Sequence, residues 1–297
     1  MSTTEVDFTA PLVATGNLRR RHRVSRAAEG LALGSSVAAV AVLGIIVAYV
    51  VVHGAGALSL DFLTKEPSPG GGPGGGIAPA IVGTGLLVGV ATVIAMPIGV
   101  LVAVYLTEFA GPAAARPIRL ALDLLNGLPS IVVGLFVFGL LVVGKHQSGF
   151  AAAFALSIIM LPLIARSTQE MLGLVPRQLR EAADALGVSR WRTVLTVVLP
   201  SAAGGIVTGT VLAVARAAGE TAPLIFTSSI FGNRVTLDLL GTPIPNIPVQ
   251  IFTLSETPDP SGYERAWGAA FVLLSFILVA NIGARALLTR SRKKMGR

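Results

Sequence analysis

The chain has 297 residues, of which 53% are hydrophobic and only 13% are charged, and its mean hydropathy is +0.77. This composition excludes an ordinary soluble domain of the same length, which needs far more surface charge, and it indicates long apolar spans. The chain contains no cysteine, which excludes disulfides, thiolate metal sites and thioester lipid anchors. The histidines His22, His53 and His146 show no ligand spacing, so we expect no metal site.

Six apolar runs approach the length of about 20 residues that a helix needs to cross a bilayer. In chain order they lie near residues 30–52, 78–107, 120–143, 149–166, 202–226 and 267–288. The fourth run is short, and the fifth is interrupted by charge. The first run exceeds the usual apolar region of a signal peptide, about 7–15 residues, so we interpret 29–53 as a retained transmembrane helix. The predicted fold class is an all-α polytopic membrane protein with six transmembrane helices.

The first run is flanked by two polar segments. Residues 1–28 form a basic tail that we expect to lack order, and residues 54–76 form a linker ending in PSPGGGPGGG. This glycine-rich stretch does not fit a nucleotide loop, because no Lys-Ser/Thr pair follows it and no predicted strand precedes it. We interpret it as a flexible outer linker. No P-loop signature occurs in the chain, so we expect no catalytic residue and no bound cofactor, with any ATP used by a partner subunit.

The net charge of +8 is explained by the distribution of basic residues along the predicted topology. Eighteen of the 23 lysines and arginines lie in the tails and in the loops on the tails' side. The others are Lys65, Lys145, Arg234 and Arg265 on the opposite side, and Arg216 inside a span. Because positive charge is retained on the cytoplasmic side, we expect both termini to be cytoplasmic. This distribution accounts for the basic composition without a nucleic-acid partner.

Two predicted loops on the cytoplasmic side differ in length. EFAGPAAARPIR joins spans two and three, whereas residues 167–201 form a long connection that includes EAADALGVSRWRTVLTVVLP. Glu181 to Leu186 favour a helix, Gly187 interrupts it, and Ser189 is a candidate cap for a second helix beginning at Arg190. Pro200 marks the approach to the next span. This helix–turn–helix is either an interfacial connector anchored by Trp191 or a surface that another protein grips.

The spacing within this connection resembles a known motif. Glu181-Ala182-Ala183, three residues, Gly187, nine residues and Val197-Val198-Leu199-Pro200 are similar to the EAA loop of ABC importer permeases. Val197 stands where that pattern usually has isoleucine. The resemblance implies coupling helices that dock on an ATP-hydrolysing subunit. It assigns that coupling role to Glu181, Ala182, Ala183, Gly187, Leu199 and Pro200.

Three further stretches resemble the PstA-type permease subunits of phosphate-specific ABC importers. They are ARAAGETAPLIFTS at 215–228, NGLPSIVVGLF at 126–136 and NIPVQIF at 246–252. The resemblance covers roughly residues 77–290. It implies a MetI-like five-helix core at 77–288 behind an extra N-terminal helix, with a basic tail at 289–297, in the bacterial plasma (inner) membrane.

The partners implied by this resemblance are a PstC-like permease, two copies of a PstB-like ATPase and an outer PstS-like phosphate-binding protein, together with membrane lipid. Permeases for another oxyanion, such as sulfate or molybdate, share the EAA loop and remain an alternative. A secondary transporter would need coupling-ion sites, and a structural or signalling protein would need no intramembrane charge pair. The EAA spacing weighs against both of these classes.

A charge pair in the fifth span is the candidate substrate site. An arginine at a helix centre costs about 2.5–3.5 kcal/mol on insertion scales, and Glu220 lies one helical turn after Arg216. The pair either fixes helix packing or presents a guanidinium to a passing oxyanion, with the carboxylate keeping that anion from being trapped. Gly219 and Pro223 are expected to break the helix there.

Other polar residues lie at the start of the third span. Asp123 lies four residues after Arg119 and is expected to form a boundary ion pair. The stretch from Asn126 to Pro129 predicts a kink, after which Ser130 is a candidate pathway hydroxyl.

Overall fold

The computed structural model describes residues 16–68, 74–229, 232, 234–257 and 259–295. Its regular secondary structure in these ranges is helical, with an isolated antiparallel bridge between Pro67 and Gly75. The chain divides into two units, Met1–Val52 and His53–Arg297, and each is described by itself.

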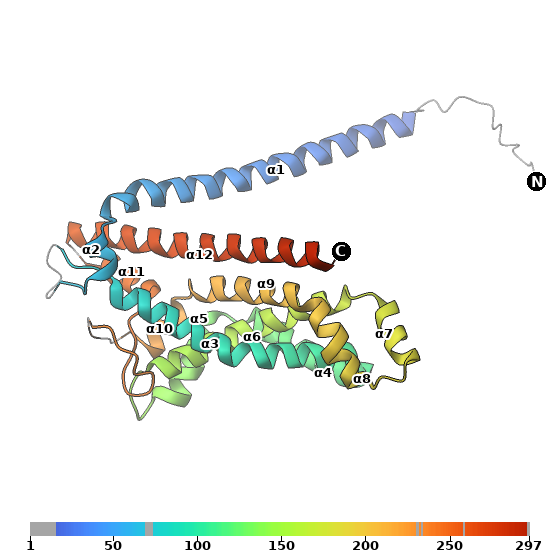
Figure 1. The fold of residues 1–297 in the computed structure, drawn as a ribbon. Helices are drawn as coiled ribbons and strands as arrows, with labels where there is room; N and C mark the ends of the chain where they lie inside the picture. Colours follow the sequence, from blue (N-terminus) through green and yellow to red (C-terminus); the bar gives the residue numbers. More distant parts are fainter. Residues whose placement is uncertain (1–15, 69–73, 230–231, 233, 258, 296–297) are drawn as a thin grey trace, which may run out of the picture. The chain divides into compact units, whose positions relative to one another are not determined.

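The helices follow one another closely along the chain (Figure 1). They are α1 (Gly16–Gly54), the 3-10 turn η1 (Ala55–Ala57), α2 (Leu60–Thr64), α3 (Ala78–Val104), α4 (Pro112–Gly127), α5 (Ser130–Val137), α6 (Gly149–Gly173), α7 (Arg177–Ala185), α8 (Arg190–Thr193), α9 (Leu199–Ala217), α10 (Ala222–Thr227), α11 (Ile247–Ser255) and α12 (Pro260–Met295). Three π-helical segments, η3 (Tyr105–Phe109), η4 (Phe138–Val142) and η5 (Val194–Val198), continue α3, α5 and α8. Within the described residues, five helices are long and apolar enough to cross a membrane, and the bent pair α4–α5 makes a sixth if counted as one span.

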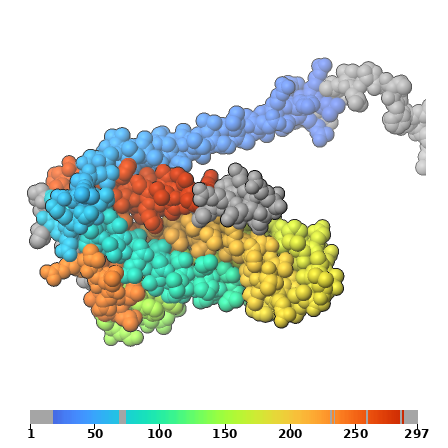
Figure 2. All heavy atoms as spheres, in the orientation of Figure 1, coloured from blue at the N-terminus to red at the C-terminus, as the bar shows by residue number. Residues whose placement is uncertain are grey.

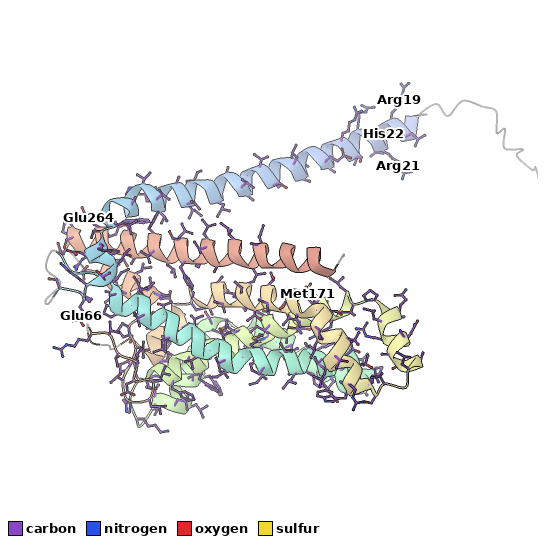
Figure 3. The ribbon with its side chains drawn as sticks, viewed as in Figure 1. Arg19, Arg21, His22, Glu66, Met171 and Glu264 are labelled. Atoms are coloured by element: carbon purple, nitrogen blue, oxygen red, sulfur yellow. The ribbon has the colours of Figure 1, made fainter. Side chains whose placement is uncertain are left out.

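The described part of the first unit is α1 from Gly16 to Val52. Arg19, Arg21 and His22 lie on its first turns (Figure 3). The expectation of an unordered tail is therefore wrong for residues 16–28, where the arginines are good helix formers, while residues 1–15 lie outside the described residues. Within the apolar part, the hydroxyl of Ser35 donates to the carbonyl of Leu31 at 2.8 Å, so this polar group needs no water.

Small residues allow the helices of the second unit to pack closely. The main apolar cluster joins α3, α6 and α9 through residues that include Ala91, Ala95, Ala152, Met160 and Ala213. A Cβ on Gly99 of α3 would lie 3.0 Å from the side chain of Ile164 on α6. Met171 of α6 (Figure 3) similarly occupies the space where a Cβ on Gly205 of α9 would lie. This use of small residues between apolar helices is typical of membrane proteins.

The third predicted span is bent rather than straight. α4 ends at Gly127, α5 begins at Ser130, and the two helices meet at 99°. The predicted kink is thus confirmed. The predicted cytoplasmic loop before it is wrong in part, because α4 already begins at Pro112. This helix buries Ala115 and Leu122 and leaves its arginines exposed, which is the amphipathic pattern of a helix lying on a core.

The fifth predicted span begins earlier and ends earlier than the sequence indicated. The helix runs without interruption from Arg190 through Pro200 to Ala217, and α10 follows a break. The π-helical turns of η5 lie directly before Pro200, which has no amide hydrogen to donate within a regular helix. The break predicted from Gly219 and Pro223 is confirmed.

Backbone hydrogen bonds fix the described residues on both sides of the glycine-rich linker. Gly75 has φ +76°, and the amide of Gly76 donates to the carbonyl of Glu66 at 3.0 Å. The described flanks of the glycine-rich linker are therefore fixed, while residues 69–73 lie outside the described residues. The predicted long outer loop at 227–266 contains α11 and the first turns of α12, so it is helical in part.

Two polar residues make hydrogen bonds at the starts of α11 and α12. The fully buried Asn246 accepts from the amide of Val249 at 3.0 Å, and it donates to the carbonyl of Ser228 at 3.2 Å. Asp259 precedes α12 and accepts from the hydroxyl and the amide of Ser261. These hydrogen bonds, with the nearby charge of Arg265, lower the pKa of the exposed Asp259 carboxyl.

Candidate functional site

The polar connection forms a projection at one end of the second unit. α7 and α8 lie at the end of the core away from α2 and α11 (Figure 1), and their residues gather there on the surface (Figure 2). We call residues 177–193 the coupling segment. Its helix–turn–helix is the structure that the sequence predicted.

The turn of the coupling segment depends on Gly187. Its φ is +69°, and the amide of Val188 donates to the carbonyl of Ala183 at 3.1 Å, which closes the end of α7. A Cβ at this glycine would meet no atom within 4 Å, so the constraint is conformational and not steric crowding. Ser189 is the residue before α8, as predicted, but its side chain makes no capping hydrogen bond. The predicted side-chain cap is therefore wrong: at the start of α8 the backbone carbonyl of Ser189 accepts from the amide of Thr193 at 3.0 Å.

The residues of the EAA pattern separate into an outward and an inward group. Glu181 and Ala182 are exposed, whereas Ala183 is buried against the core. Leu186, at the tip, is 82% exposed and presents an apolar surface to solvent. Leu199 and Pro200 lie beyond the coupling segment at the start of α9, where Leu199 packs against the cluster around Val104 and Leu172.

A buried ion pair ties α7 to the core. The Arg180 guanidinium lies 2.7 Å from the carboxylate of Glu108 on η3, and only 7% of that glutamate side chain is exposed. Arg180 also donates to the carbonyls of Val175 at 2.8 Å and Leu172 at 3.0 Å, at the end of α6. These contacts use the fork of the guanidinium on several sides and join three elements.

An aromatic contact places α8 beside the same π-helical segment. The ring of Trp191 lies 5.6 Å from the ring of Phe109, and the guanidinium of Arg190 lies 5.5 Å from the Phe109 centroid. Trp191 is the predicted aromatic anchor only in the alternative that treats the segment as an interfacial connector. The structure shows it half-exposed and packed on Phe109, so it orients α8 against η3.

The Arg216–Glu220 pair lies where α9 stops. Arg216 is in the last turn of α9, Glu220 follows in the break, and the Arg216 Nε lies 3.7 Å from a Glu220 carboxylate oxygen. The Arg216 side chain is 59% exposed and that of Glu220 is 15% exposed. The pair is therefore formed on one side of the chain, as predicted, and most of the guanidinium remains accessible on the surface of this subunit.

Ser130 belongs to a neighbouring element. It is the first residue of α5 and is half-buried. Four residues later, a Cβ on Gly134 would lie 2.6 Å from the Cα of Pro223, so α5 packs directly on α10. The rings of Phe138 and Phe226 extend this contact at 6.2 Å. The structure thus brings α5 beside the segment that follows the Arg216–Glu220 pair.

The boundary ion pair of Asp123 has a different partner from the predicted one. Its carboxylate pairs with Arg166 of α6 and not with Arg119 of its own helix. The reason is that α4 lies along α6, where Leu122 and Ala165 belong to one apolar cluster. Both charged side chains are about half-exposed, so this pair resembles a surface ion pair and its contribution to stability is small.

Sequence reasoning missed the Glu108–Arg180 pair. The distribution of basic residues uses Arg180 only as cytoplasmic charge, and the predicted loop between spans two and three contains Glu108. The available signal was an acidic residue at the end of an apolar run, between Leu106 and Phe109. Its partner was not readable, because 72 residues separate the two. No group of three histidine, aspartate or glutamate side chains forms a candidate metal site in the described part of the chain.

Solved chains of ABC transporters share the fold of this chain. The chain matches a chain of the inward-facing MetNI methionine ABC transporter with a TM-score of 0.56 and 17% identity, over 72% of this chain and 94% of that one. It also matches a chain of the bacterial alginate ABC transporter, solved in complex with an alginate pentasaccharide-bound periplasmic protein. The TM-score is 0.59 and the identity 14%, over 92% of this chain and 95% of that one. At these identities the fold alone is shown, and the predicted all-helical MetI-like fold is confirmed.

Sequence comparisons identify the family. Residues 95–293 match the family described as binding-protein-dependent transport system inner membrane component. The phosphate transport system permease protein PstA of Pasteurella multocida is 42% identical over 82% of this chain and 86% of its own length. PstA of Yersinia pestis is 41% identical over 82% of both chains, and PstA 1 of Mycobacterium tuberculosis is 41% identical over 74% and 72%. This chain belongs to the family of binding-protein-dependent transport system inner membrane components.

Proposed function

We propose that this chain is the PstA-type permease subunit of an ATP-driven phosphate importer. The relatives named PstA cover most of this chain and support phosphate as the substrate class. The observation that carries the proposal is the position of Glu181, Ala182 and Leu186, exposed together on a projection at the end of the helical core. A permease that uses no ATPase has no need of such a surface.

In this proposal, a PstB-like ATPase docks on the coupling segment, and this chain itself binds no ATP. Movement of α7 passes to η3 through the Arg180–Glu108 ion pair. Movement of α8 passes along the uninterrupted helix from Arg190 to Ala217, which is 28 residues long. Arg216 lies in the last turn of that helix, so docking and the candidate pathway are joined by one continuous helix. Gly187 holds the turn, and Leu199 and Pro200 position the helix behind it.

Arg216 supplies the positive charge that attracts the oxyanion. Its guanidinium is mostly exposed on this subunit, so it is available to a pathway formed with a PstC-like permease. Glu220 lies close enough to weaken the attraction and allow release, because conduction requires a site that the ion can leave. Ser130 contributes a hydroxyl from α5. An outer PstS-like protein delivers phosphate, and two ATPase copies drive the cycle in the bacterial plasma membrane.

The decisive experiment is assembly with the ATPase. The chain is co-expressed with a candidate ATPase, the second permease and the binding protein, and the purified complex is assayed for ATP hydrolysis with phosphate, sulfate or molybdate. We expect co-purification and stimulation by phosphate-loaded binding protein. Stimulation by sulfate or molybdate alone would assign another oxyanion, whereas uptake without any bound ATPase would replace the proposal with a secondary transporter.

A second experiment tests the orientation. The chain has no cysteine, so single cysteines at Glu66, Glu264 and Ser189, all exposed, report without background. Glu66 and Glu264 both lie at the end away from α7 (Figure 3). With both termini cytoplasmic, an impermeant reagent labels the first two positions in intact cells and labels Ser189→Cys only after the membrane is opened. Outside labelling of Ser189→Cys would reverse the orientation and remove the docking site.

A further inference from the structure

A pocket at the base of α7 is lined by four arginines, and none of them belongs to the EAA pattern. Its volume is about 500 Å³, and its charged lining consists of Arg119, Arg177, Arg180, Arg190, Glu108 and Glu181. The remaining lining comes from the ends of η3 and α6 and includes Leu106 and Leu172. We call this hollow the basic pocket.

The ion pairs within the basic pocket leave an excess of positive charge. Arg180 is already engaged by Glu108 at 2.7 Å and by two backbone carbonyls. Three further arginines of the lining are exposed, and Glu181 is the remaining carboxylate beside them. A neighbouring hollow of about 220 Å³ is different, because Glu108 and Asp184 there balance Arg180 and Arg190. Arg190 lines both hollows, so Arg119 and Arg177 carry the excess that belongs to the basic pocket alone.

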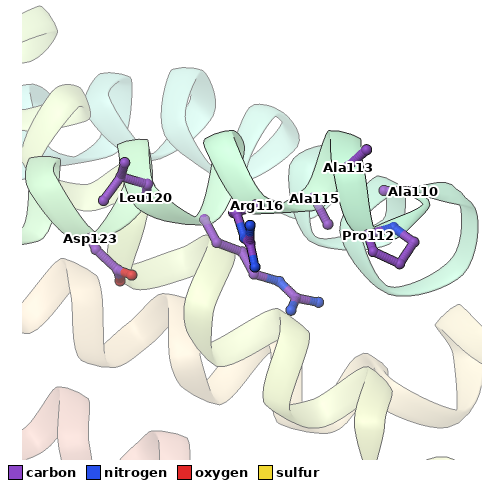
Figure 4. Close-up of a pocket in the computed structure, with 8 residues that line it drawn as sticks. Ala110, Pro112, Ala113, Ala115, Arg116, Leu120 and Asp123 are labelled. Carbon is purple, nitrogen blue, oxygen red and sulfur yellow. The ribbon is translucent and has the colours of Figure 1, made fainter.

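The three arginines come from three different elements. Arg119 is on α4, Arg177 begins α7, and Arg190 begins α8. Arg119 also lines a second, larger hollow along α4, where Arg116 stands beside small and apolar residues such as Ala113 and Leu120 (Figure 4). Asp123 also lines this hollow and pairs with Arg166, so Arg116 and Arg119 continue the positive charge from the basic pocket along α4.

We propose that the basic pocket binds a phosphate group, supplied either by free inorganic phosphate or by the headgroup of an anionic phospholipid. Guanidinium groups bind phosphate oxygens in pairs, and several converging from separate elements bind one anion more strongly than surface charges do. This site is distinct from Arg216, which lies at the far end of α9. A bound phosphate group would bridge α4, α7 and α8, and so would hold the coupling segment against the core.

Hydrogen–deuterium exchange of the full chain in nanodiscs tests the proposal. In one arm the nanodiscs contain phosphatidylcholine, and inorganic phosphate is compared with chloride at equal ionic strength. In the other arm phosphatidylglycerol replaces part of the phosphatidylcholine, without free phosphate. We expect slower amide exchange in peptides covering residues 175–193 in at least one arm, and that arm identifies the source of the phosphate group.

Variants locate the effect. The protection is expected to be lost in Arg119→Gln/Arg177→Gln/Arg190→Gln and reduced in the single variant Arg177→Gln, which keeps the other contacts. Arg192→Gln is the matched control, because Arg192 is an exposed arginine of α8 that does not line the basic pocket. No protection in either arm, or equal loss in Arg192→Gln, would overturn the proposal.

The measurement uses neither ATP nor transport, so it separates this proposal from the proposed function. Arg216→Leu/Glu220→Leu is expected to retain the protection whether or not it supports uptake. If phosphate protects only residues around Arg216, the pathway is supported and the basic pocket is refuted.

Discussion

Two arginine–glutamate pairs in this chain have opposite designs. Arg180 and Glu108 lie 2.7 Å apart with 24% and 7% of their side chains exposed, and Arg180 makes further bonds to two carbonyls. Arg216 and Glu220 lie 3.7 Å apart, and the arginine is 59% exposed. The first pair joins elements distant in sequence, whereas the second lies within one turn of the same chain segment.

The Arg180–Glu108 pair is a structural brace, whereas the guanidinium of Arg216 is available for binding. A guanidinium whose donors are mostly used by its own chain has little left for a ligand, and breaking such a buried pair leaves a charge without a partner. Removing a loosely paired, exposed guanidinium changes the free energy of unfolding little, and such a guanidinium retains donors for an oxyanion. The coupling end is therefore expected to respond to substitution in stability, and the α9–α10 break in transport.

The largest expected effect on stability is at the brace. Arg180→Leu leaves Glu108 buried without a counter-charge, and we expect a loss of about 3 kcal/mol in unfolding free energy, at the lower end of values for buried pairs because Arg180 is not fully buried. Denaturant unfolding of the purified chain in detergent measures it. Arg192→Leu, an exposed arginine of the next helix, is the control. Equal midpoints for the two variants would show that the pair is not a brace.

The turn of the coupling segment should show the next largest effect. Gly187→Val forces a β-branched residue to φ +69°, which costs roughly 1–2 kcal/mol and shifts the turn. We expect the chain to insert and fold but to lose the co-purifying ATPase. Gly173→Val is the matched control, since a Cβ there also meets no atom within 4 Å and no left-handed φ is involved. Normal ATPase binding and uptake in Gly187→Val would make the segment a simple connector.

At the break between α9 and α10 we expect a smaller loss of stability but a complete loss of phosphate transport. Arg216→Leu/Glu220→Leu removes both charges together, so unfolding free energy should change by less than about 1 kcal/mol. The complex should assemble, and phosphate uptake into proteoliposomes should be lost because the charge that attracts the oxyanion is gone. Robust uptake by this double variant would assign the pair to helix packing and leave the permease assignment intact.

The smallest change, Arg216→Lys, sharpens the same comparison. Lysine keeps the charge but loses the planar fork, which removes about one charge-assisted hydrogen bond of roughly 1.5 kcal/mol, or about tenfold in uptake efficiency. Stability should stay as in the parent chain. Uptake kinetics at varied phosphate concentration measure the effect, and unchanged kinetics would mean that only the charge matters.

The sequence by itself determined the features that depend on neighbouring residues. Length and hydropathy predicted the helical spans, and the stretch from Asn126 to Pro129 predicted the bend. Gly187 predicted the turn of the coupling segment, and Gly219 with Pro223 predicted the end of α9. Each of these is a property of a few consecutive residues, because φ, hydrogen-bond donors and apolar length act locally.

Only the tertiary structure decided the partners of the charged side chains. Asp123 pairs with Arg166 of a neighbouring helix although Arg119 is one turn away, and Arg180 pairs with Glu108 across 72 residues. The apolar packing of α4 and α7 on the core sets which side chains meet, and that packing is not readable from local spacing. Helix starts shifted for the same reason: α4 begins in a predicted loop because its apolar face is buried by α6.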